Sequence, residues 1–283
     1  MAEILKGAPV AAAITEGLIV RAHLLRQKGI TPCLAILRVG ERPDDLAYER
    51  GAMKRCEKVG IRVESIVLDA ACTQQELLQA IMRVNADGAI HGCLMFRPLP
   101  KHLDEQEACE ALIPRKDVDS MTAASLRTVF TGRGVGFAPC TAQSVLELLD
   151  FYGVNPAGKH VAVIGRSLVI GKPVAMMLQT RNATVTMCHT KTVNMPEICK
   201  EAEILVVAAG KAGIVDRSFT NPDQIVIDVG INTAPDGTIC GDVCFDQVEP
   251  FVRGISPVPS GVGSVTTAVL AKHVIEAAER FLK

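Results

Sequence analysis

Residues 160–178 read HVAVIGRSLVIGKPVAMML and carry the strongest local structural signal in the chain. An apolar, β-branched run leads into Gly165, a short loop ends at Gly171, and a helical pattern begins at Pro173, whose fixed φ suits a first helical turn. A strand, a glycine turn and a helix N-terminus in this order present free backbone N–H groups to a phosphate. The spacing GxxxxxG differs from the GxGxxG fingerprint, so a purely structural strand-to-helix turn is the alternative at this point.

The next apolar strand bears on which dinucleotide such a site would bind. Folds that prefer NAD place an acidic residue near the end of the second strand, about 20 residues further on, where it binds the ribose 2′-hydroxyl. Here TVTMC at 184–188 runs into HTKT at 189–192 without a carboxylate, and Arg166 follows the turn glycine. A cation and hydroxyls in place of an acid favour a 2′-phosphate, and therefore NADP over NAD. For Arg166 and Lys191 the alternative is solvated surface charge.

Two later glycines extend the same expectation. ILVVAAGKAG and QIVIDVGIN each place a glycine just past an apolar run, at Gly210 and Gly230. A missing side chain lets backbone approach a ligand closely. Ligands of open α/β sheets bind outside the carboxyl ends of the strands, where both loops would lie.

Apolar runs rich in β-branched residues alternate with helical patterns along the chain. One helix candidate, residues 73–85, opens with a Thr73 and Glu76 capping box, and another covers 142–152. This alternation predicts an α/β protein built from βαβ units with largely parallel sheets. The strand candidates are residues 33–39, 61–68, 89–96, 160–164, 184–188, 204–208 and 224–228.

The pattern also predicts two domains. Glycines and a proline interrupt it at 133–141, RGVGFAPCT, before a new helix begins. We therefore expect one domain over residues 1–140 and a second over 141–263. The last segment, 264–283, is a helix candidate, and the pattern alone leaves open which domain it packs on.

Composition limits the partners. The chain has 283 residues, 48% hydrophobic and 22% charged, with a formal net charge of -1, no tryptophan and two tyrosines, which argues against nucleic-acid binding. Glu3, Lys6 and Glu16 interrupt the apolar N-terminus, so we expect a cytoplasmic protein without a membrane span. The ten cysteines form no CxxC pair, which favours buried reduced thiols over a metal site or disulfides.

A series of short motifs runs in order along the chain and makes it resemble a known family. These are VG at 39–40, Tyr48, CEKVGI at 56–61, RPLP at 97–100, KDVD at 116–119, PCT at 139–141, GRSLVIGKP at 165–173, CHTKT at 188–192, IDVGIN at 227–232, GDV at 241–243 and PVPSGVG at 257–263. Together they resemble the tetrahydrofolate-dependent methylene dehydrogenase/cyclohydrolases over essentially the whole chain.

The resemblance implies a fold and a reaction. It implies a folate-binding α/β domain that includes the final helix, a Rossmann-like NADP-binding domain with a parallel sheet, and a homodimer. The family oxidises 5,10-methylenetetrahydrofolate to the 5,10-methenyl cation with NADP, and usually hydrolyses that cation to 10-formyltetrahydrofolate, within one-carbon metabolism and purine biosynthesis.

Site residues follow from the same resemblance, motif by motif. It implies catalytic roles for Tyr48, stacked near the pterin, and Asp119, which would hold the polar edge of the pterin. The remaining substrate residues would be Leu99, Pro100, Pro257, Pro259, Gly261, Val262 and Gly263. The NADP residues would be Gly165, Arg166, Ser167, Ile170, Gly171, Pro173, His189, Thr190, Gly210, Gly230 and Ile231, with Thr190 where the family often has serine.

Several positions depart from the family pattern. The family has a lysine four residues after the tyrosine, on the same helix face, and this chain has Ala52. The glutamine of the QLPLP motif is Phe96, and the serine three residues before the tyrosine is Asp45. In the PVPGGVGPMT motif the changed positions are Ser260, Ser264 and Val265. The changes gather on the folate side, whereas the NADP motifs are nearly intact.

These departures affect the two half-reactions differently. Hydride transfer needs the methylene carbon held against the nicotinamide ring. Hydrolysis needs a general acid/base, a role that a lysine with a lowered pKa can serve and an alanine cannot. We therefore expect a dehydrogenase whose cyclohydrolase is weakened or lost. Lys54 should point about 200° away from position 52.

Other interpretations stay open. In the first, Asp45, Glu49 or Lys54 substitutes for the missing lysine and the enzyme is bifunctional. In the second, the protein is a non-catalytic folate or dinucleotide sensor. In the third, the changed positions redirect the pocket to another pterin or carbon adduct.

Overall fold

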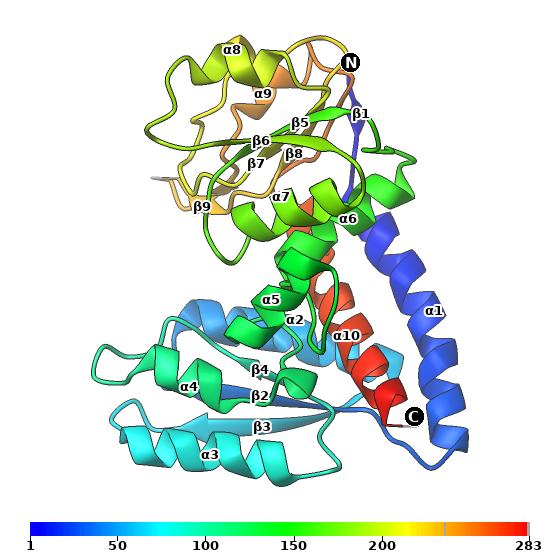
Figure 1. The fold of residues 1–283 in the computed structure, drawn as a ribbon, viewed down its shortest axis with the longest axis vertical. Coiled ribbons are helices and arrows are strands. Elements are labelled where there is room, and N and C mark those ends of the chain that lie inside the picture. Colours follow the sequence, from blue (N-terminus) through cyan, green and yellow to red (C-terminus); the bar gives the residue numbers. More distant parts are fainter. Residues whose placement is uncertain (235, 282–283) are drawn as a thin grey trace. The chain divides into compact units, whose positions relative to one another are not determined.

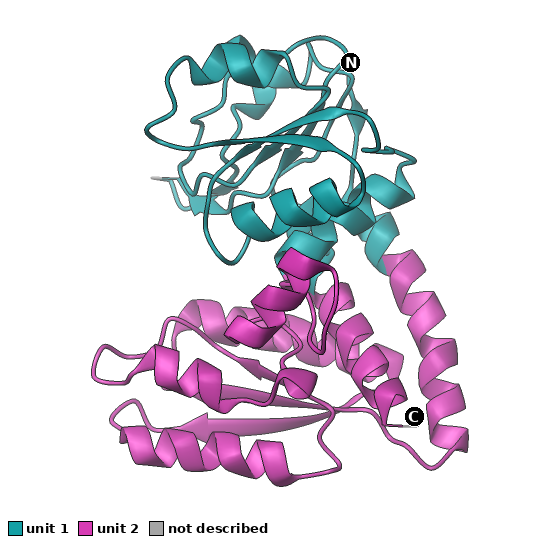
Figure 2. Ribbon diagram, in the orientation of Figure 1, with its two compact units in different colours: residues 1–11, 141–266 teal, residues 12–140, 267–283 magenta. Residues whose placement is uncertain are grey.

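The computed structural model describes residues 1–234 and 236–281, which form two compact units (Figure 2). Unit 1 contains Met1–Ala11 and Thr141–Thr266, and unit 2 contains Ala12–Cys140 and the described residues from Thr267 onward. Both are α/β, which confirms the predicted fold class.

A six-stranded sheet forms the centre of unit 1, and all of its strand pairs are parallel. The strand order is β1 (Glu3–Ile4), β11 (Gly254–Ile255), β8 (Ile225–Asp228), β7 (Ile204–Val207), β5 (His160–Ile164) and β6 (Thr184–Cys188). From β5 the chain first goes to β6 on one side and then to β7 on the other. This reversal of strand order is where open α/β sheets bind their ligands.

Short helices and turns complete unit 1 (Figure 1). The strands β7 and β8 are buried along their whole length, as expected for parallel strands covered on both faces. The other elements are α6 (Cys140–Phe151), α7 (Gly171–Thr180), α8 (Met195–Lys200), α9 (Phe245–Val248), the 3₁₀ turns η2 (Arg217–Phe219) and η3 (Val262–Ser264), and the antiparallel pair β9 (Asn232–Thr233) and β10 (Ile239–Cys240).

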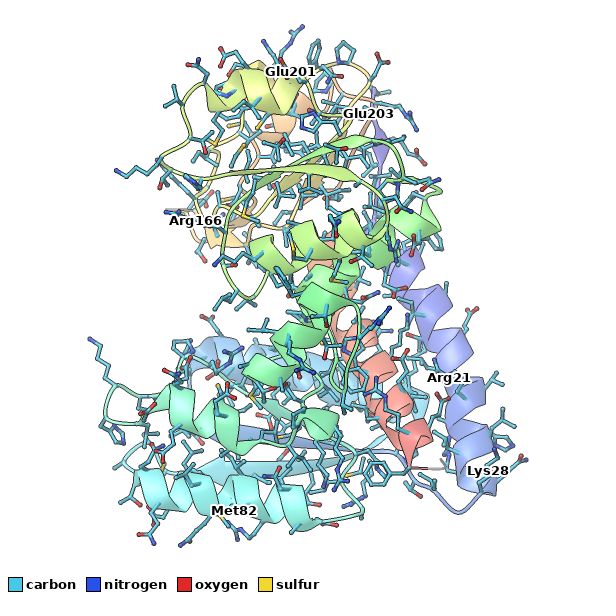
Figure 3. All side chains as sticks on the ribbon, in the orientation of Figure 1. Arg21, Lys28, Met82, Arg166, Glu201 and Glu203 are labelled. Carbon is cyan, nitrogen blue, oxygen red and sulfur yellow. The ribbon has the colours of Figure 1, made fainter. Side chains whose placement is uncertain are left out.

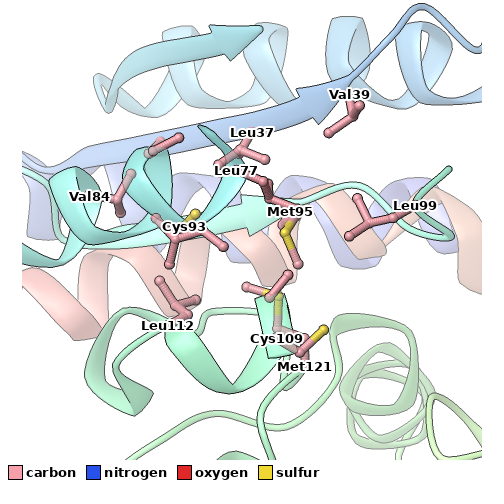
Figure 4. Packing of buried hydrophobic residues seen from close by; sticks show 14 of the residues in the cluster. Leu37, Val39, Leu77, Val84, Cys93, Met95, Leu99, Cys109, Leu112 and Met121 are labelled. Carbon is pink, nitrogen blue, oxygen red and sulfur yellow. The ribbon is translucent and has the colours of Figure 1, made fainter. Parts of the chain in front are cut away.

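Unit 2 is built on a three-stranded parallel sheet with β2 (Cys33–Val39) between β3 (Arg62–Leu68) and β4 (Gly92–Met95). Leu37 and Met95 from this sheet, Leu77 from α3 and Met121 belong to one buried apolar cluster (Figure 4). The helices of unit 2 are α2 (Pro43–Val59), α3 (Gln74–Ala86), α4 (Glu105–Ala111), α5 (Ala123–Thr131), the 3₁₀ turn η1 (Pro114–Lys116), and most of α1 (Gly7–Gln27) and α10 (Thr266–Arg280).

The capping box predicted at the start of α3 is confirmed. The Thr73 hydroxyl accepts a hydrogen bond from the Glu76 N–H at 3.2 Å, and the Glu76 carboxylate accepts one from the Thr73 N–H at 2.7 Å. The helix begins one residue later than predicted because Thr73 is its N-cap rather than its first turn.

Several predicted boundaries were wrong. The strand predicted over 89–96 covers only Gly92–Met95, and those predicted over 61–68, 204–208 and 224–228 are each shorter by one residue. The helix predicted over 142–152 begins at Cys140 and ends at Phe151. Of the final segment 264–283, a helix forms over Thr266–Arg280, and residues 282–283 lie outside the described part. Pattern alone locates the middle of an element better than its ends.

The assignment of residues 1–140 to one domain was also wrong at its start. Glu3 and Ile4 pair in parallel register with Gly254 and Ile255, so the N-terminus supplies the edge strand of the unit 1 sheet. A two-residue strand carries no periodicity that a sequence pattern could reveal.

Helix α1 is, by length and composition alone, apolar enough to cross a membrane, contrary to the expectation from its interrupted N-terminal runs. Packing within the structure accounts for only part of this composition, because 33% of the apolar stretch is buried. Leu18, Ala22 and Leu25 are buried, and Arg21 forms an ion pair with Glu279 of α10 at 2.7 Å. One face of α1 therefore packs within the fold, whereas Val20 and Leu24 on its other side are 60% and 51% exposed.

Candidate dinucleotide and folate sites

The turn between β5 and α7 contains two glycines at which any side chain would clash with backbone atoms. Gly165 has φ +124, and a Cβ there would lie 2.1 Å from the carbonyl oxygen of Ala208. A Cβ at Gly171 would lie 2.2 Å from the carbonyl oxygen of Gly165. The chain can therefore fold back tightly on itself, and α7 begins at Gly171, two residues before the predicted Pro173. The result is a helix N-terminus at the carboxyl end of β5, the arrangement that binds phosphate.

Ser167 organises this turn. Its hydroxyl accepts hydrogen bonds from the N–H groups of Ile170 at 3.1 Å and Gly171 at 3.4 Å. These are among the first N–H groups of the helix, which have no partner inside it. Ser167 and Ile170 thus lie where the sequence predicted dinucleotide contacts.

The loop after β6 brings hydroxyl and cationic groups to the same edge of the sheet. The N–H of Gly165 donates to the carbonyl of Cys188, so the glycine turn lies beside this loop. His189 donates its N–H to the Thr192 hydroxyl at 2.9 Å, whereas Thr190 and Lys191 are exposed. Arg166 is also exposed at the surface of unit 1 (Figure 3). Charge and exposure in this arrangement suit a 2′-phosphate.

The glycines after β7 and β8 have a structural reason that the sequence did not predict. Gly210 has φ +65, which favours glycine. A Cβ at Gly230 would lie 2.2 Å from Cγ of Asp242. The close approach at Gly230 is therefore to a buried carboxylate of the protein itself.

A pocket of about 190 Å³ opens within unit 1 beside these loops. Ile231, which is 68% exposed, lies on its rim. Val262 is buried and does not line the pocket. The predicted site residues that do line it are Gly230, Ile231, Pro257, Pro259, Gly261 and Gly263.

Ser260 lies in the loop that frames this pocket and has φ +83, in the left-handed region that favours glycine. The family resemblance expects glycine at this position. The loop is held in place from the N-terminus, because the N–H of Gly7 donates to the Ser260 carbonyl at 2.8 Å. The serine therefore costs about 1 kcal/mol of backbone strain in a loop that is anchored.

The residues of the KDVD motif in unit 2 have distinct roles. Lys116 is fully buried and donates to the carbonyls of Val84, Asn85 and Asp87 at the end of α3. The Asp117 carboxylate accepts the N–H groups of Met121 and Thr122, each at 2.9 Å. Lys116 and Asp117 therefore have structural roles, because they satisfy backbone groups at the end of α3 and at residues 121–122.

Asp119 is the residue of this motif that the family resemblance assigns to the substrate. It is half-buried and accepts a hydrogen bond from the Cys140 N–H at 2.8 Å. Burial raises the pKa of the Asp119 carboxyl, although hydrogen bonds from the backbone and the side chain of Cys140 lower it. Such a carboxyl can exchange hydrogen bonds with an amide or amidine edge of a ligand in either protonation state.

One face of α2 carries the changed position that matters most. Asp45, Glu49 and Ala52 lie on its buried face, and Ala52 is 0% exposed. Lys54 is exposed, as expected from its angle around the helix. Glu49 is engaged, because its carboxylate binds Arg38 at 3.0 Å and the Ser65 hydroxyl at 3.1 Å.

The departures from the family pattern contact neighbouring site residues. The ring of Phe96 meets Tyr48 edge to face, with centroids 6.0 Å apart. Asp45 lies 3.7 Å from Arg42, and Arg42 also donates to the carbonyl of Pro98 at 2.8 Å. The start of α2 and the RPLP turn are thus joined by residues that the family resemblance does not predict there.

Asp228 and Asp242 were missed as individual site residues, although they lie inside the IDVGIN and GDV motifs. Both are buried, and both accept backbone N–H groups from the loops described above. A carboxylate inside an apolar strand run was the signal that could have identified Asp228, since such residues are seldom buried without partners.

Family models cover nearly the whole chain. Residues 5–119 match the tetrahydrofolate dehydrogenase/cyclohydrolase catalytic domain, and residues 139–282 match the NAD(P)-binding domain of the same family. The chain belongs to the tetrahydrofolate dehydrogenase/cyclohydrolase family. The dehydrogenase/cyclohydrolase model counts the final helix with the NAD(P)-binding domain, whereas in the structure α10 belongs mostly to unit 2.

Individual relatives agree in length and fold. The chain is 51% identical over 281 residues to the bifunctional protein FolD of Carboxydothermus hydrogenoformans, covering 99% of this chain and 98% of that one. It superimposes on the crystal structure of the bifunctional FolD of Campylobacter jejuni with a TM-score of 0.96 at 36% identity, covering 99% of this chain and 100% of that one. The Trypanosoma brucei enzyme, solved with NADP and an inhibitor, gives 0.93 at 35% identity and covers 100% and 99%.

Proposed function

We propose that this protein oxidises 5,10-methylenetetrahydrofolate to 5,10-methenyltetrahydrofolate by hydride transfer to NADP, and that its hydrolysis of the methenyl cation is weakened or absent. The observation that carries the proposal is Ala52, buried on the α2 face where the family resemblance expects a lysine. The relatives of this chain that are named bifunctional support the dehydrogenase activity. The change at position 52 bears on the hydrolysis alone.

Hydride transfer asks the protein for position and charge rather than for an acid/base. A folate nitrogen supplies the electron pair that expels the hydride, so the methylene carbon must be held against the nicotinamide. The phosphate turn at Gly165 and the loop at Thr190 support NADP binding in unit 1. In unit 2, Tyr48 would contact the pterin ring and Asp119 would accept its polar edge.

Hydrolysis of the methenyl cation needs a group that deprotonates water and protonates a ring nitrogen. Alanine offers neither. Glu49 is bound to Arg38, and Lys54 lies on the exposed face of α2. Phe96 brings an apolar ring against Tyr48 where the family motif has an amide. This face of α2 therefore lacks the lysine and the nearby glutamine that the family pattern provides for hydrolysis.

Asp45 supports the alternative, a bifunctional enzyme with a substitute acid/base. Burial raises the pKa of the Asp45 carboxyl, and Arg42 opposes that shift. A carboxyl with a raised pKa is a candidate general acid/base. If Asp45 serves, Asp45→Asn abolishes hydrolysis and leaves NADPH formation within a few-fold.

The purified protein tests the proposal directly. NADPH formation and methenyl decay are followed separately after adding methylenetetrahydrofolate and NADP. We expect enzyme-dependent NADPH formation together with methenyl that accumulates and decays near its buffer rate. Enzyme-dependent decay as fast as NADPH formation contradicts the loss of hydrolysis. No NADPH formation at all favours the sensor, and turnover only with other pterins favours the redirected pocket.

Cofactor choice has its own prediction. Arg166→Ala should raise KM for NADP about 10-fold and leave KM for NAD within about two-fold, because a hydrogen bond to a charged group contributes about 1.5–3 kcal/mol. The matched control is Lys159→Ala, which removes a charge just before β5, at the opposite end of the strand. Equal effects of Arg166→Ala on both cofactors would contradict recognition of a 2′-phosphate.

The assembly and location belong to the same proposal. We infer a cytoplasmic homodimer with a tetrahydrofolate derivative as its small-molecule partner. Light scattering during size-exclusion chromatography at several concentrations checks the dimer, and a monomer at micromolar concentration contradicts it.

A further inference from the structure

Two buried carboxylates join the loops that follow β7 and β8. Asp242 is 0% exposed and Asp228 is 3% exposed. Among the residues that the structure describes, neither carboxylate forms an ion pair with a cation. Burying a carboxylate is costly unless hydrogen bonds compensate, so their partners should reveal what they do.

The partners of Asp242 are nearly all backbone. Its Oδ2 accepts the N–H groups of Ala209 at 2.7 Å and Gly210 at 2.8 Å. Its Oδ1 accepts the N–H of Lys211 at 2.9 Å and the side-chain amide of Asn232 at 2.9 Å. Three successive N–H groups therefore converge on one carboxylate, and the fourth donor comes from the loop after β8.

Asp228 holds Asp242 in turn. Its Oδ1 accepts the N–H groups of Gly230 at 2.9 Å and Asp242 at 3.1 Å, and its Oδ2 accepts the N–H of Val243 at 2.9 Å. Glycine is required on both sides of the pair, because a Cβ at Gly241 would lie 1.9 Å from an Asp228 oxygen. The two carboxylates thus determine the conformation of three loops at one edge of the sheet.

The strand order tells which part of a dinucleotide these loops would face. The phosphate turn follows β5, and the loop with Thr190 follows β6 on one side of it. The loops after β7 and β8 lie on the other side of β5. A dinucleotide whose pyrophosphate lies at the α7 N-terminus and whose adenosine lies toward β6 directs its nicotinamide half toward β7 and β8.

We propose that Asp242 is a positioning residue that shapes the nicotinamide half of the dinucleotide site by fixing the loops 208–213 and 229–232, and that Asp228 fixes Asp242. This inference rests on the proposed dinucleotide function of unit 1. In either orientation, the side-chain amide of asparagine at 242 would turn its NH₂ group toward N–H donors. One of the two loops that now donate to Asp242 must therefore move away.

The test compares the binding of a complete dinucleotide with the binding of its adenosine half alone. Dissociation constants of the full-length protein are measured for NADPH, by its fluorescence, and for adenosine 2′,5′-bisphosphate, which lacks the nicotinamide half, by calorimetry. We expect Asp242→Asn to raise the dissociation constant for NADPH about 10-fold or more, and that for the bisphosphate less than two-fold. In turnover, KM for NADP should rise while KM for methylenetetrahydrofolate stays within two-fold.

Matched variants separate positioning from general damage. Asp236→Asn changes an exposed carboxylate that accepts the N–H of Thr238 in its own turn. This substitution should leave the dissociation constants of both ligands unchanged. If Asp242→Asn does not fold, Asn232→Ala removes a single donor and should weaken NADPH about three-fold, again sparing the bisphosphate. Equal weakening of both ligands, or of neither, overturns the inference. Failure of the unmodified protein to bind NADPH overturns the proposed function instead.

Discussion

Ala52 offers a test in which one activity should be restored. The double substitution Ala52→Lys and Phe96→Gln returns the amine and the amide that the family resemblance expects. Burial on this face lowers the pKa of a lysine, as a general acid/base requires. We expect methenyl hydrolysis to rise at least about 100-fold, since a positioned acid/base contributes about 10² to 10⁴ in rate. The measurement is methenyl decay under excess enzyme.

The control places the same lysine on the other face of the helix. Ala47 is exposed, so Ala47→Lys with Phe96→Gln adds an equal charge without reaching the buried face. Hydrolysis should stay at the level of the unmodified protein. A rise as large as that of the Ala52 variant would mean that position 52 is not the deciding one.

The sequence predicts the spacing of side chains along a helix but not the partners that they contact. The separation of Ala52 from Lys54 follows from helix geometry, and the structure agrees. The contact of Phe96 with Tyr48 and the hydrogen bond from Arg42 to Pro98 join segments far apart in the chain. No local pattern encodes such a contact, because it depends on how β4 and α2 come together in the folded unit.

The β5–α7 turn gives a prediction at the scale of elements. Gly171→Ala would place a methyl group 2.2 Å from the Gly165 carbonyl oxygen, so the turn must open. We expect a loss of about 2 kcal/mol or more in the free energy of unfolding, as for overpacking, together with loss of NADPH binding. Urea unfolding and NADPH fluorescence measure the two effects.

Its control is a glycine in open space. Gly17 lies within α1 with nothing within 4 Å of a Cβ, so Gly17→Ala should stabilise the protein by about 0.5–1 kcal/mol and leave NADPH binding unchanged. If Gly171→Ala behaves like Gly17→Ala, the close packing of the turn is not needed for the site.

Strand β8 carries a second element-scale prediction through Asp228. Burial raises the pKa of its carboxyl to about 6, whereas an unfolded aspartate titrates near 4. The native state therefore holds this proton up to higher pH than the unfolded state does, and stability falls as pH rises from about 4 to about 6. Relative to Asp228→Asn, which does not titrate, the unmodified protein should lose roughly 1.4 kcal/mol between pH 5 and pH 7.5.

Denaturant unfolding of both proteins across that pH range measures the difference. Asp236→Asn is the control, because its carboxyl is exposed and hydrogen bonds from Thr238 lower its pKa, so its curve should run parallel to that of the unmodified protein above pH 5. A difference between the unmodified protein and Asp228→Asn that stays constant with pH would mean that Asp228 is already ionised at pH 5.

At this scale the sequence predicted the elements whose pattern is long and regular. The strands Cys33–Val39, His160–Ile164 and Thr184–Cys188 match their predicted bounds, because each is a continuous apolar or alternating run. Strands β1 and β11 have two residues each and exist only because they pair with a neighbour. Their formation depends on tertiary contacts, which explains why the N-terminus was assigned to the wrong unit.

Within the described residues, the chain passes between the two units three times, each time inside a helix. The first lies inside α1, between Ala11 and Ala12, and the others lie within the first turns of α6 and α10. Unfolding one unit must therefore disrupt helices that continue into the other.

We expect a single calorimetric transition, although NADP binds within unit 1 under the proposed function. At 100 times its Kd, NADP should stabilise the protein by about 2.7 kcal/mol and raise that single Tm by roughly 5 °C. Tetrahydrofolate should move the same transition. Two resolved transitions, with only one shifted by NADP, would show that the shared helices do not couple the units.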